Sequence, residues 1–475
     1  MRIMFEHFKR ICTSVGDSIA YVGSNGEITY YELYNKVCIY SELLKKQGTS
    51  PVVIYGHKET DYVIAVFSCL IAKRTYVPVD WFMPEGRLQH IIELTGAELI
   101  INCSDDSSIN TDVETVSLSE LELFSGENIK ASDNENAYII FTSGSTGKPK
   151  GVPITYSNLS NFISWISSKK MLGSYADAIV LNQASFSFDL SVADLFYSIF
   201  NGHTLVALSK NELNDHTDIL NKLKKYKVKI CVVTPTFIRF CLLSPDFNSG
   251  FLPELSCIYF CGEKLEISLV RKLISRFPEL DIINAYGPTE ATSAVSGIFI
   301  TEDMLSGDIL PVGETDNFST DISVENDEIV LKGKSVFKGY LGESEGGYYC
   351  ADGVSCFKTG DIGYIKDNKL YCVGRRDNQI KYKGYRIELN DIESNILMCN
   401  GVNECAVVAA KGSGGEVRYI RAFVVLDQAI GLDSIKKQIA EKLPFYMIPK
   451  VFTVIDQLPA NDNKKTDRAR LSLYD

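Results

Sequence analysis

Hydrophobic and polar positions divide the first third of the chain into two kinds of segment that alternate. Short apolar runs, typical of buried strands, occupy residues 51–55 and 99–102. Residues 60–72 and 86–95 instead show the apolar spacing of helices. Strands that alternate with helices are typical of parallel sheets covered by helices. The pattern therefore predicts an α/β fold for this region.

A second set of alternating helices and strands follows between residues 158 and 233. It predicts helices at 158–168, 190–201 and 217–225 and strands at 178–181, 204–208 and 229–233. From about Ile309 the pattern changes to short β segments bounded by turn residues, such as 327–333 and 369–374. We therefore expect two α/β sheet layers followed by a β-rich subdomain.

The last hundred residues have the pattern of a compact α+β unit. Its expected elements are helices 388–398 and 432–442 and strands 404–410 and 420–426. The polar run 374–378 precedes this unit and suits a domain boundary. The sequence thus predicts a large domain, 1–376, and a small C-terminal domain, 377–475.

Composition narrows the class of protein. The 475 residues are 45% hydrophobic and carry a formal net charge of −12, which argues against nucleic acid as a partner. The thirteen cysteines are scattered, so we expect buried thiols rather than a disulfide framework, and the histidines show no zinc-ligand spacing. The N-terminus lacks a signal-peptide core, and no apolar run reaches membrane-spanning length. We expect a cytoplasmic enzyme with no membrane partner.

The segment 141–151 has the composition of a phosphate-binding loop. Glycine N–H groups can approach an anion closely, hydroxyls add donors, and Lys148 and Lys150 add positive charge. It is not a Walker A loop, because its lysine follows Gly144 too soon and Pro149 opposes a helix. A flexible Gly/Ser-rich linker is the alternative. The apolar run before the loop favours a strand that leads into a functional loop.

Two further clusters combine polar side chains with turn residues. In 284–290 an aromatic ring, a hydroxyl and a carboxylate suit a nucleotide with its metal, and Glu290 is a candidate Mg²⁺ ligand. In 358–361 the carboxylate of Asp361 follows a glycine and can hold both hydroxyls of a ribose. The structural alternatives are a capped helix start at Thr289 and an ordinary turn aspartate at Asp361.

These clusters occur in the order found in a known family. The chain resembles, over nearly its whole length, the adenylate-forming superfamily of acyl-CoA synthetases, firefly-type luciferases and adenylation domains of nonribosomal peptide synthetases. The motifs that carry the resemblance are 29–33, 76–80, 141–151, 188–189, 284–290, 358–361, 374–381 and 443–449. Within the superfamily the chain looks most like the D-alanine:D-alanyl carrier protein ligases, at 186–192, 234–237, 260–263 and 290–292.

The resemblance implies a reaction in two halves. A carboxylate attacks the α-phosphorus of ATP and gives an acyl-adenylate and pyrophosphate, and a thiol then attacks the acyl carbon and releases AMP. By resemblance, Thr289 contacts the α-phosphate, Glu290 binds Mg²⁺, Tyr286 stacks on adenine and Asp361 grips the ribose, with help from Arg375. The other residues expected to bind ATP are Thr142, Ser143, Gly144, Ser145, Thr146, Gly147, Lys150, Asn284, Ala285 and Gly287.

Residues of the small domain are expected to serve the two halves in turn. Lys465 matches the family lysine that bridges substrate carboxylate and phosphate during adenylation. The family usually has glycine where Lys464 stands, so Lys464 and a solvated charge run remain alternatives. Asp377 matches the hinge about which the small domain rotates, with a surface turn as its alternative reading. Lys381 follows at the family's spacing and is expected to approach the active site after rotation.

The residue after Phe188 indicates which acid is activated. In this family a carboxylate at the position of Asp189 pairs with the α-ammonium group of an amino acid, and a buried ammonium needs a charged partner. A helix N-cap is the structural alternative, and both roles can coexist. The other expected pocket residues are Leu190, Ala193, Val232, Tyr259, Cys261, Gly262, Ala285, Ser293 and Ala294.

The resemblance therefore implies a stand-alone amino acid ligase. D-alanine is the first expected substrate. The D-alanine ligases usually have threonine at Ala285 and valine at Ser293, so serine, glycine, L-alanine or a small nonproteinogenic amino acid remain open. No carrier domain pattern follows Arg468, so we expect a separate carrier protein with a phosphopantetheine thiol. The alternatives are an acyl-CoA synthetase for a small non-amino acid, a luciferase-like oxygenase and a nonenzymatic ATP-binding module.

Overall fold

The chain divides into two compact units. The computed structural model describes residues 2–104, 109–123, 135–144, 147–316, 320–342, 346–412, 415–427, 431–459 and 466–473. Unit 1 comprises residues 1–81, 92–140 and 151–376. Unit 2 comprises residues 82–91, 141–150 and 377–475. The longest stretch of unit 2 thus begins at Asp377.

The first sheet of unit 1 is the parallel sheet expected for the first third of the chain. Its strand order is β6-β5-β3-β4-β7-β8, and the pairs from β6 to β7 are parallel. The strands are β3 (Val52–Gly56), β4 (Tyr76–Asp80), β5 (Leu99–Asn102), β6 (Glu114–Val116), β7 (Asn136–Thr142) and β8 (Lys150–Thr155). Helices α3 (Thr60–Ala72) and α4 (Glu85–Thr95) connect β3 to β4 and β4 to β5.

The second sheet confirms the second α/β region. Its order is β14-β13-β12-β11-β9-β10-β1-β2, with six parallel strands between antiparallel edge strands. The strands are β1 (Ile19–Val22), β2 (Glu27–Thr29), β9 (Ile179–Asn182), β10 (Thr204–Ala207), β11 (Ile230–Val233), β12 (Cys257–Phe260), β13 (Asp281–Tyr286) and β14 (Ser296–Phe299).

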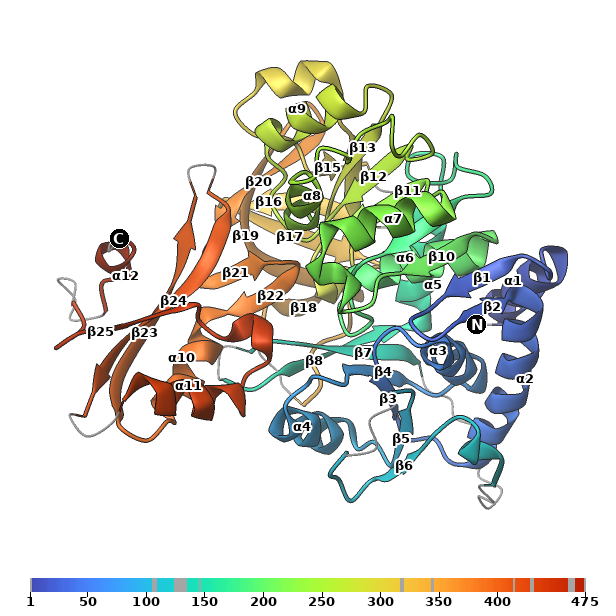
Figure 1. The fold of residues 1–475 in the computed structure, drawn as a ribbon, viewed down its shortest axis with the longest axis horizontal. Coiled ribbons are helices and arrows are strands. Elements are labelled where there is room, and N and C mark those ends of the chain that lie inside the picture. The colour runs from blue at the N-terminus through green and yellow to red at the C-terminus, as the bar shows by residue number, and fades with distance from the viewer. Residues whose placement is uncertain are drawn as a thin grey trace. The chain divides into compact units, whose positions relative to one another are not determined.

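Both faces of the second sheet are apolar, and helices cover both of them. Helices α7 (His216–Tyr226), α8 (Pro235–Cys241) and α9 (Ile267–Arg276) pack on the face that includes Val233 and Phe260 (Figure 1). Helices α5 (Tyr156–Ile166) and α6 (Leu190–Asn201) share the other core with Val232 and Tyr259. That core continues to α3 and the first sheet. Loops at the ends of β9 to β13 therefore start from a largely buried layer.

The β-rich subdomain of unit 1 is an antiparallel sheet, as expected from the change of pattern near Ile309. Its order is β15-β20-β19-β17-β16, and β18 pairs with β19. The strands are β15 (Gly313–Glu314), β16 (Thr320–Glu325), β17 (Glu328–Gly333), β18 (Tyr348–Ala351), β19 (Val354–Lys366) and β20 (Lys369–Arg375).

Unit 2 contains the expected α+β elements around its own core. These are β21 (Gln379–Tyr382), β22 (Tyr385–Glu388), α10 (Leu389–Leu397), β23 (Val402–Lys411), β24 (Val417–Leu426), α11 (Leu432–Ala440), β25 (Val451–Val454) and α12 (Arg468–Leu471). The antiparallel pair β23 and β24 gains a third, parallel strand in β25. The sequence pattern predicted neither β25 nor the β21–β22 hairpin.

Two N-terminal helices complete unit 1. They are α1 (Arg2–Ser14) and α2 (Tyr30–Lys46). The start of α2 is a capping box, in which the Thr29 side chain accepts a hydrogen bond from the Glu32 N–H and Glu32 accepts one from the Thr29 N–H. The motif at 29–33 therefore has a local structural role.

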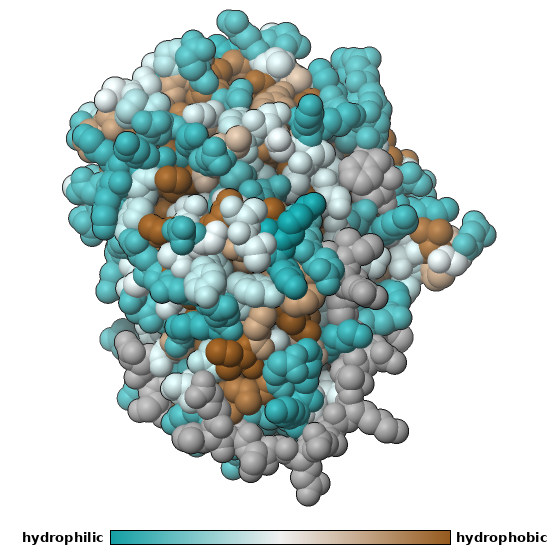
Figure 2. Space-filling view, turned by 90° about the vertical axis from the view of Figure 1, so that its right-hand side faces the viewer, coloured by the Kyte–Doolittle hydropathy of each residue, from teal (hydrophilic) through white to brown (hydrophobic). Residues whose placement is uncertain are grey.

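The surface and the cysteines fit the composition. None of the thirteen cysteines, all of which lie in the described part of the chain, forms a disulfide, and most are buried. On the face drawn in Figure 2, hydrophobic residues form separate small patches among hydrophilic ones. Among the described residues, no helix is long and apolar enough to cross a membrane.

Candidate active site

A tyrosine, an aspartate and an arginine from three strands meet at one buried point of unit 1. The Tyr286 hydroxyl donates a hydrogen bond to Asp361 Oδ2 over 2.6 Å, and Arg375 Nη1 lies 2.7 Å from Asp361 Oδ1. Asp361 and Arg375 are partners in the antiparallel β19–β20 pair, and Tyr286 ends β13. Burial, reinforced by the Asp361 charge, raises the pKa of Tyr286 well above its usual value. The phenol therefore stays protonated and acts as a donor.

The turn after Tyr286 is tightly held. A side chain at Gly287 would approach the Ala294 Cα to 2.5 Å, so only glycine fits there. Thr292 and Ser293 have φ values of 62° and 70°, which are unusual for residues with a side chain. Thr292 is held by a hydrogen bond from its hydroxyl to the Ser335 carbonyl. The close packing at Gly287 and the hydrogen bond of Thr292 therefore hold a turn whose backbone is strained at two residues.

Asp189 and Thr289 lie side by side, although 100 residues separate them. The Thr289 hydroxyl donates a hydrogen bond to Asp189 Oδ2 over 2.6 Å. Asp189 stands at the N-terminus of α6 but makes no capping hydrogen bond with its side chain. The carboxylate thus points toward Thr289 rather than back to its own helix. The structural alternative, in which the Asp189 side chain caps α6, is therefore not formed.

Glu290 is completely buried. It lies in the short 3₁₀ turn Thr289–Ala291, which Pro288 precedes without a side-chain cap, so the capped helix start considered for Thr289 does not form. The Tyr340 hydroxyl donates to Glu290 Oε1 over 2.6 Å. Carboxylates are ligands that Mg²⁺ uses together with phosphate oxygens. The role of Glu290 as a Mg²⁺ ligand stays a prediction.

The residues expected to line the amino acid pocket share one buried layer. Val232 and Tyr259 are register partners on β11 and β12, and Ala285 lies on the adjacent strand β13. Cys261 Sγ lies 4.0 Å from the Ser293 carbonyl oxygen. Leu190, Ala193 and Ala294 are also buried. Gly262 adopts a backbone φ of 91°. The second sheet and α6 therefore both contribute residues to the expected amino acid pocket.

Two details of this layer bear on its chemistry. The Tyr259 hydroxyl is fully buried and has no hydrogen-bond partner among the described residues. Such a group is costly unless a ligand or water pairs with it. The Asn284 side chain instead donates to the Pro311 carbonyl over 2.7 Å, inside the protein.

The described residues of the phosphate loop up to Lys150 belong to unit 2. A side chain at Gly144 would approach the Lys148 carbonyl oxygen to 2.2 Å, and Gly147 adopts φ 83°. The Ser143 hydroxyl donates to the Arg386 carbonyl and accepts a hydrogen bond from the Glu388 N–H. Both of these backbone partners lie on β22, directly before α10. The loop backbone is thus built around glycines.

The other predicted residues of unit 2 are only partly described. Lys150 begins β8, Thr142 ends β7, and Lys381 lies on β21. Asp377 is exposed and accepts a hydrogen bond from the Gln379 N–H. The predictions for Ser145, Thr146, Lys464 and Lys465 lie outside the described residues.

Some residues of this site were not predicted from the sequence. Tyr340, the partner of Glu290, follows no motif and could be found only from the fold. A buried polar network around His57 and Asp80 was also missed as a site feature. A signal was present, because Asp80 and the pair His57-Lys58 directly follow apolar strands.

Comparison with known proteins agrees with this geometry. The family model of AMP-binding enzymes matches residues 8–341, and the model of the AMP-binding enzyme C-terminal domain matches residues 391–465. Among curated proteins, the D-alanine–D-alanyl carrier protein ligase of Bacillus licheniformis is 37% identical, covering 98% of each chain. The protein of the same name from Bacillus cytotoxicus is 36% identical, again over 98% of each chain.

Solved structures share the fold. A Vibrio cholerae adenylation domain in complex with glycyl-adenosine-5′-phosphate superposes with a TM-score of 0.82 at 24% identity, covering 98% of this chain and 96% of that one. The o-succinylbenzoate CoA synthetase of Bacillus subtilis superposes with a TM-score of 0.83 at 23% identity, covering 98% of each. The matches in sequence, extending through both parts of the chain, lead to one conclusion: this protein is a member of the AMP-binding enzyme family.

Proposed function

We propose that this protein is an ATP-dependent ligase that activates a small amino acid and transfers it to a separate carrier protein. The amino acid and ATP give an aminoacyl-adenylate and pyrophosphate. The phosphopantetheine thiol of the carrier then attacks the acyl carbon, and AMP leaves. D-alanine is the proposed substrate, because relatives at 36% and 37% identity across 98% of the chain carry the name D-alanine–D-alanyl carrier protein ligase.

The contact between Asp189 and Thr289 carries this proposal. A carboxylate suited to an α-ammonium group lies 2.6 Å from a hydroxyl suited to the α-phosphate. In the first half-reaction the substrate carboxylate attacks that phosphorus, so ammonium and phosphate must bind close together. The distance between Thr289 and Asp189 supports this arrangement. A carboxylic acid without an amino group would offer the Asp189 carboxylate no cationic group, which disfavours the CoA synthetase alternative.

The cluster around Asp361 is proposed to hold the nucleoside. A carboxylate has about four acceptor positions, so Asp361 can receive two ribose hydroxyls in addition to Tyr286 and Arg375. Arg375 holds the carboxylate in a fixed orientation. Tyr286, anchored through its hydroxyl, offers a fixed aromatic face for adenine.

Charge on the phosphates requires neutralisation in the first half-reaction. Mg²⁺ held by Glu290 would stabilise negative charge on the phosphate oxygens. Lys150, Ser143 and the glycine-rich backbone of residues 144–147 are proposed to bind the outer phosphates. Lys465 is proposed to bridge the substrate carboxylate and the α-phosphate, as its family position implies.

The second half-reaction is proposed to use other residues of unit 2. Asp377 is proposed as the hinge of a 377–475 domain, since it is exposed and begins the longest stretch of unit 2. Lys381 is proposed to replace Lys465 near the site after rotation. A cytoplasmic location fits the supply of ATP and the absence of disulfides among the thirteen cysteines.

Serine is the second candidate substrate, and one observation favours it. The buried Tyr259 hydroxyl has no hydrogen-bond partner among the described residues. A substrate hydroxyl would provide one. Ser293 replaces an apolar residue usual in the D-alanine ligases, which adds a further polar group to the expected pocket.

The experiment is amino-acid-dependent exchange of labelled pyrophosphate into ATP, run over D- and L-amino acids. D-alanine should give the highest kcat/KM. A phosphopantetheinylated carrier protein should then gain the mass of one aminoacyl group when ATP and that amino acid are present. Exchange without carrier loading would remove the transfer step from the proposal, and exchange with none of the amino acids would refute it.

A further inference from the structure

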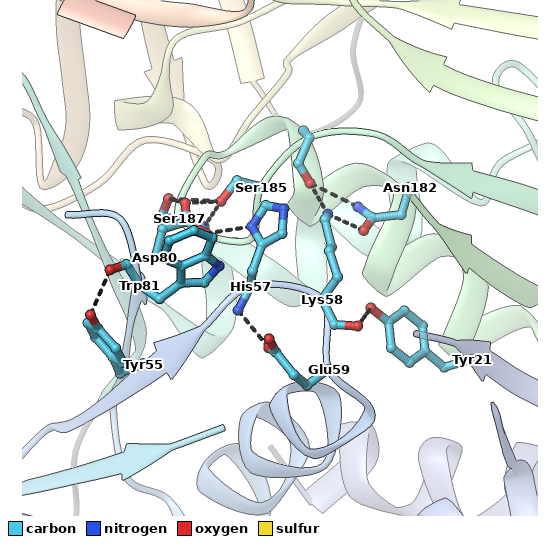
Figure 3. Close-up of polar contacts among 11 residues, drawn as sticks. Tyr21, Tyr55, His57, Lys58, Glu59, Asp80, Trp81, Asn182, Ser185 and Ser187 are labelled. Carbon is cyan, nitrogen blue, oxygen red and sulfur yellow. Dashed lines mark hydrogen bonds and ion pairs between the residues drawn. The ribbon is translucent and has the colours of Figure 1, made fainter. Parts of the chain in front are cut away.

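Asp80 forms the centre of a buried polar cluster in unit 1. Its Oδ1 lies 2.8 Å from His57 Nδ1, and its Oδ2 accepts hydrogen bonds from the hydroxyls of Ser185 and Ser187, the latter over 2.6 Å (Figure 3). All four residues are at least nine-tenths buried. One carboxylate therefore ties the ends of β3 and β4 to the loop that follows β9.

A second buried cluster lies beside the first. Lys58 donates hydrogen bonds to the Asn182 side chain (Figure 3) and to the Ala184 carbonyl. Asn182 in turn donates to Asp194 Oδ2 over 2.9 Å. Lys58 Nζ also lies 4.4 Å from the centre of the Phe186 ring. Lys58, Asn182 and Asp194 are completely buried. Burial lowers the pKa of Lys58 and raises the pKa of Asp194.

Both clusters hold the same short segment. Residues 183–189 connect β9 to α6 and end at Asp189. Asn182, Ala184, Ser185, Phe186 and Ser187 are each held by Asp80 or Lys58, and Phe188 N–H donates to the Ser185 carbonyl. Asp194 lies within α6, which begins at Leu190. The anchors therefore lie on both sides of Asp189 in the sequence.

Two buried clusters of charged and polar groups are an energetically unfavourable way to stabilise a loop for structure alone. Buried charged groups stabilise a fold less than apolar residues of similar volume, since desolvation offsets their attraction. Buried hydrogen-bonded networks can instead fix one conformation of the segment that they join. The segment they fix leads to the carboxylate that meets Thr289.

We propose that Asp80 and Lys58 are positioning residues, which hold segment 183–189 so that Asp189 stays opposite Thr289 and receives the substrate ammonium. His57 keeps Asp80 oriented by donating from Nδ1. The inference rests on the proposed function and deepens it, because it assigns amino acid affinity to residues that do not touch the amino acid.

The test is Asp80→Asn, which keeps the side-chain volume but replaces an acceptor by a donor toward the two serines. Pyrophosphate exchange is measured with D-alanine as the probe. The KM for D-alanine should rise about tenfold or more, because a small displacement of a binding group has large effects, while the KM for ATP changes little. Ser187→Ala, which removes one hydrogen bond, should shift the KM for D-alanine in the same direction by less.

A double-mutant comparison separates positioning from general damage. Asp80→Asn should add little to the D-alanine KM of Asp189→Ala, since both act on one interaction. Thr75→Val is the matched control. Thr75 directly precedes β4, which ends at Asp80, and its buried hydroxyl donates a hydrogen bond to the Asn136 carbonyl. It should lower the melting temperature but leave the D-alanine KM unchanged.

The outcomes keep the two proposals apart. If wild-type enzyme shows no amino-acid-dependent exchange, the proposed function fails. If wild type is active, and Asp80→Asn or Ser187→Ala raises both KM values equally or raises neither, only the positioning role is overturned. If Asp80→Asn does not fold, Ser187→Ala and its pairing with Asp189→Ala decide the question.

Discussion

Asp189 shows how a single side chain can be tested for its role. Asp189→Asn keeps the size of the side chain and removes its charge. The KM for D-alanine should rise by about two orders of magnitude, since losing one partner of a desolvated charge pair costs several kcal/mol. The KM for ATP in the same exchange assay is the internal control. Equal KM values for wild type and variant would mean that Asp189 does not meet the ammonium group.

Tyr259 offers a second test at this scale, through stability. Tyr259→Phe removes a buried hydroxyl that lacks a partner among the described residues. In the absence of substrate the free energy of unfolding should rise by about 1 kcal/mol, as measured by urea unfolding. Tyr286→Phe is the matched control and should lower it, because that hydroxyl is hydrogen-bonded to Asp361.

The same Tyr259→Phe variant reports on the substrate. If serine pairs with the hydroxyl, the ratio of kcat/KM for serine to that for alanine should fall. A variant that is less stable than wild type and has an unchanged ratio would show that the hydroxyl is satisfied within the protein.

Residue roles were predictable where the family resemblance applies and unpredictable elsewhere. Asp189 and Thr289 both stood in recognisable motifs, but nothing in their spacing showed that they touch across 100 residues. The backbone conformation of Ser293 also decides which substitution can test the volume of the pocket. With φ at 70°, replacement by valine would be strained, so Ala285→Thr is the sounder test of pocket volume.

Elements were predictable where periodicity and caps agree. Helices α3 and α6 have the predicted bounds, because each apolar stripe ends at a clear break. Helix α5 was predicted from 158 but begins at Tyr156, because Thr155 and Asn158 form a capping box. Strand β25 is only half-buried, so its pattern was too weak to predict. Pairing with β24 decides its conformation.

His203, between α6 and β10, links one element boundary to the pH dependence of stability. Its Nδ1 accepts a hydrogen bond from the Ala178 N–H, and burial lowers the pKa of His203 to about 4. The folded state therefore prefers the neutral ring, whereas the unfolded ring takes up a proton near pH 6.5. The free energy of unfolding should fall as pH drops from 6.5 to 4, by at most about 3 kcal/mol from this residue.

His203→Asn isolates that contribution. Asparagine keeps an acceptor near the Nδ1 position but does not titrate. The difference in unfolding free energy between wild type and variant, followed by urea unfolding at several pH values, should shrink as pH falls from 6.5 to 4. A difference that is constant over this range would show that His203 titrates normally in the folded state.

At the scale of the whole molecule, residues of unit 2 are proposed to serve the two half-reactions in turn. Lys465→Ala should remove most adenylation activity but leave transfer from preformed aminoacyl-adenylate largely intact, because its charge is proposed to serve only the first half-reaction. Each half is measured separately, by pyrophosphate exchange and by carrier loading from the adenylate. Lys464→Ala is the control and should be mild. Equal losses in both halves would argue against the assignment of Lys465.

The central claim is that the protein recognises an amino acid through its ammonium group. Propionate is alanine without that group, so the pair isolates the interaction with Asp189. The deciding measurement is kcat/KM for pyrophosphate exchange by the wild-type enzyme with D-alanine and with propionate. We predict a preference for D-alanine of at least about a hundredfold, which Asp189→Asn largely abolishes. Comparable values for D-alanine and propionate in the wild-type enzyme would contradict the account.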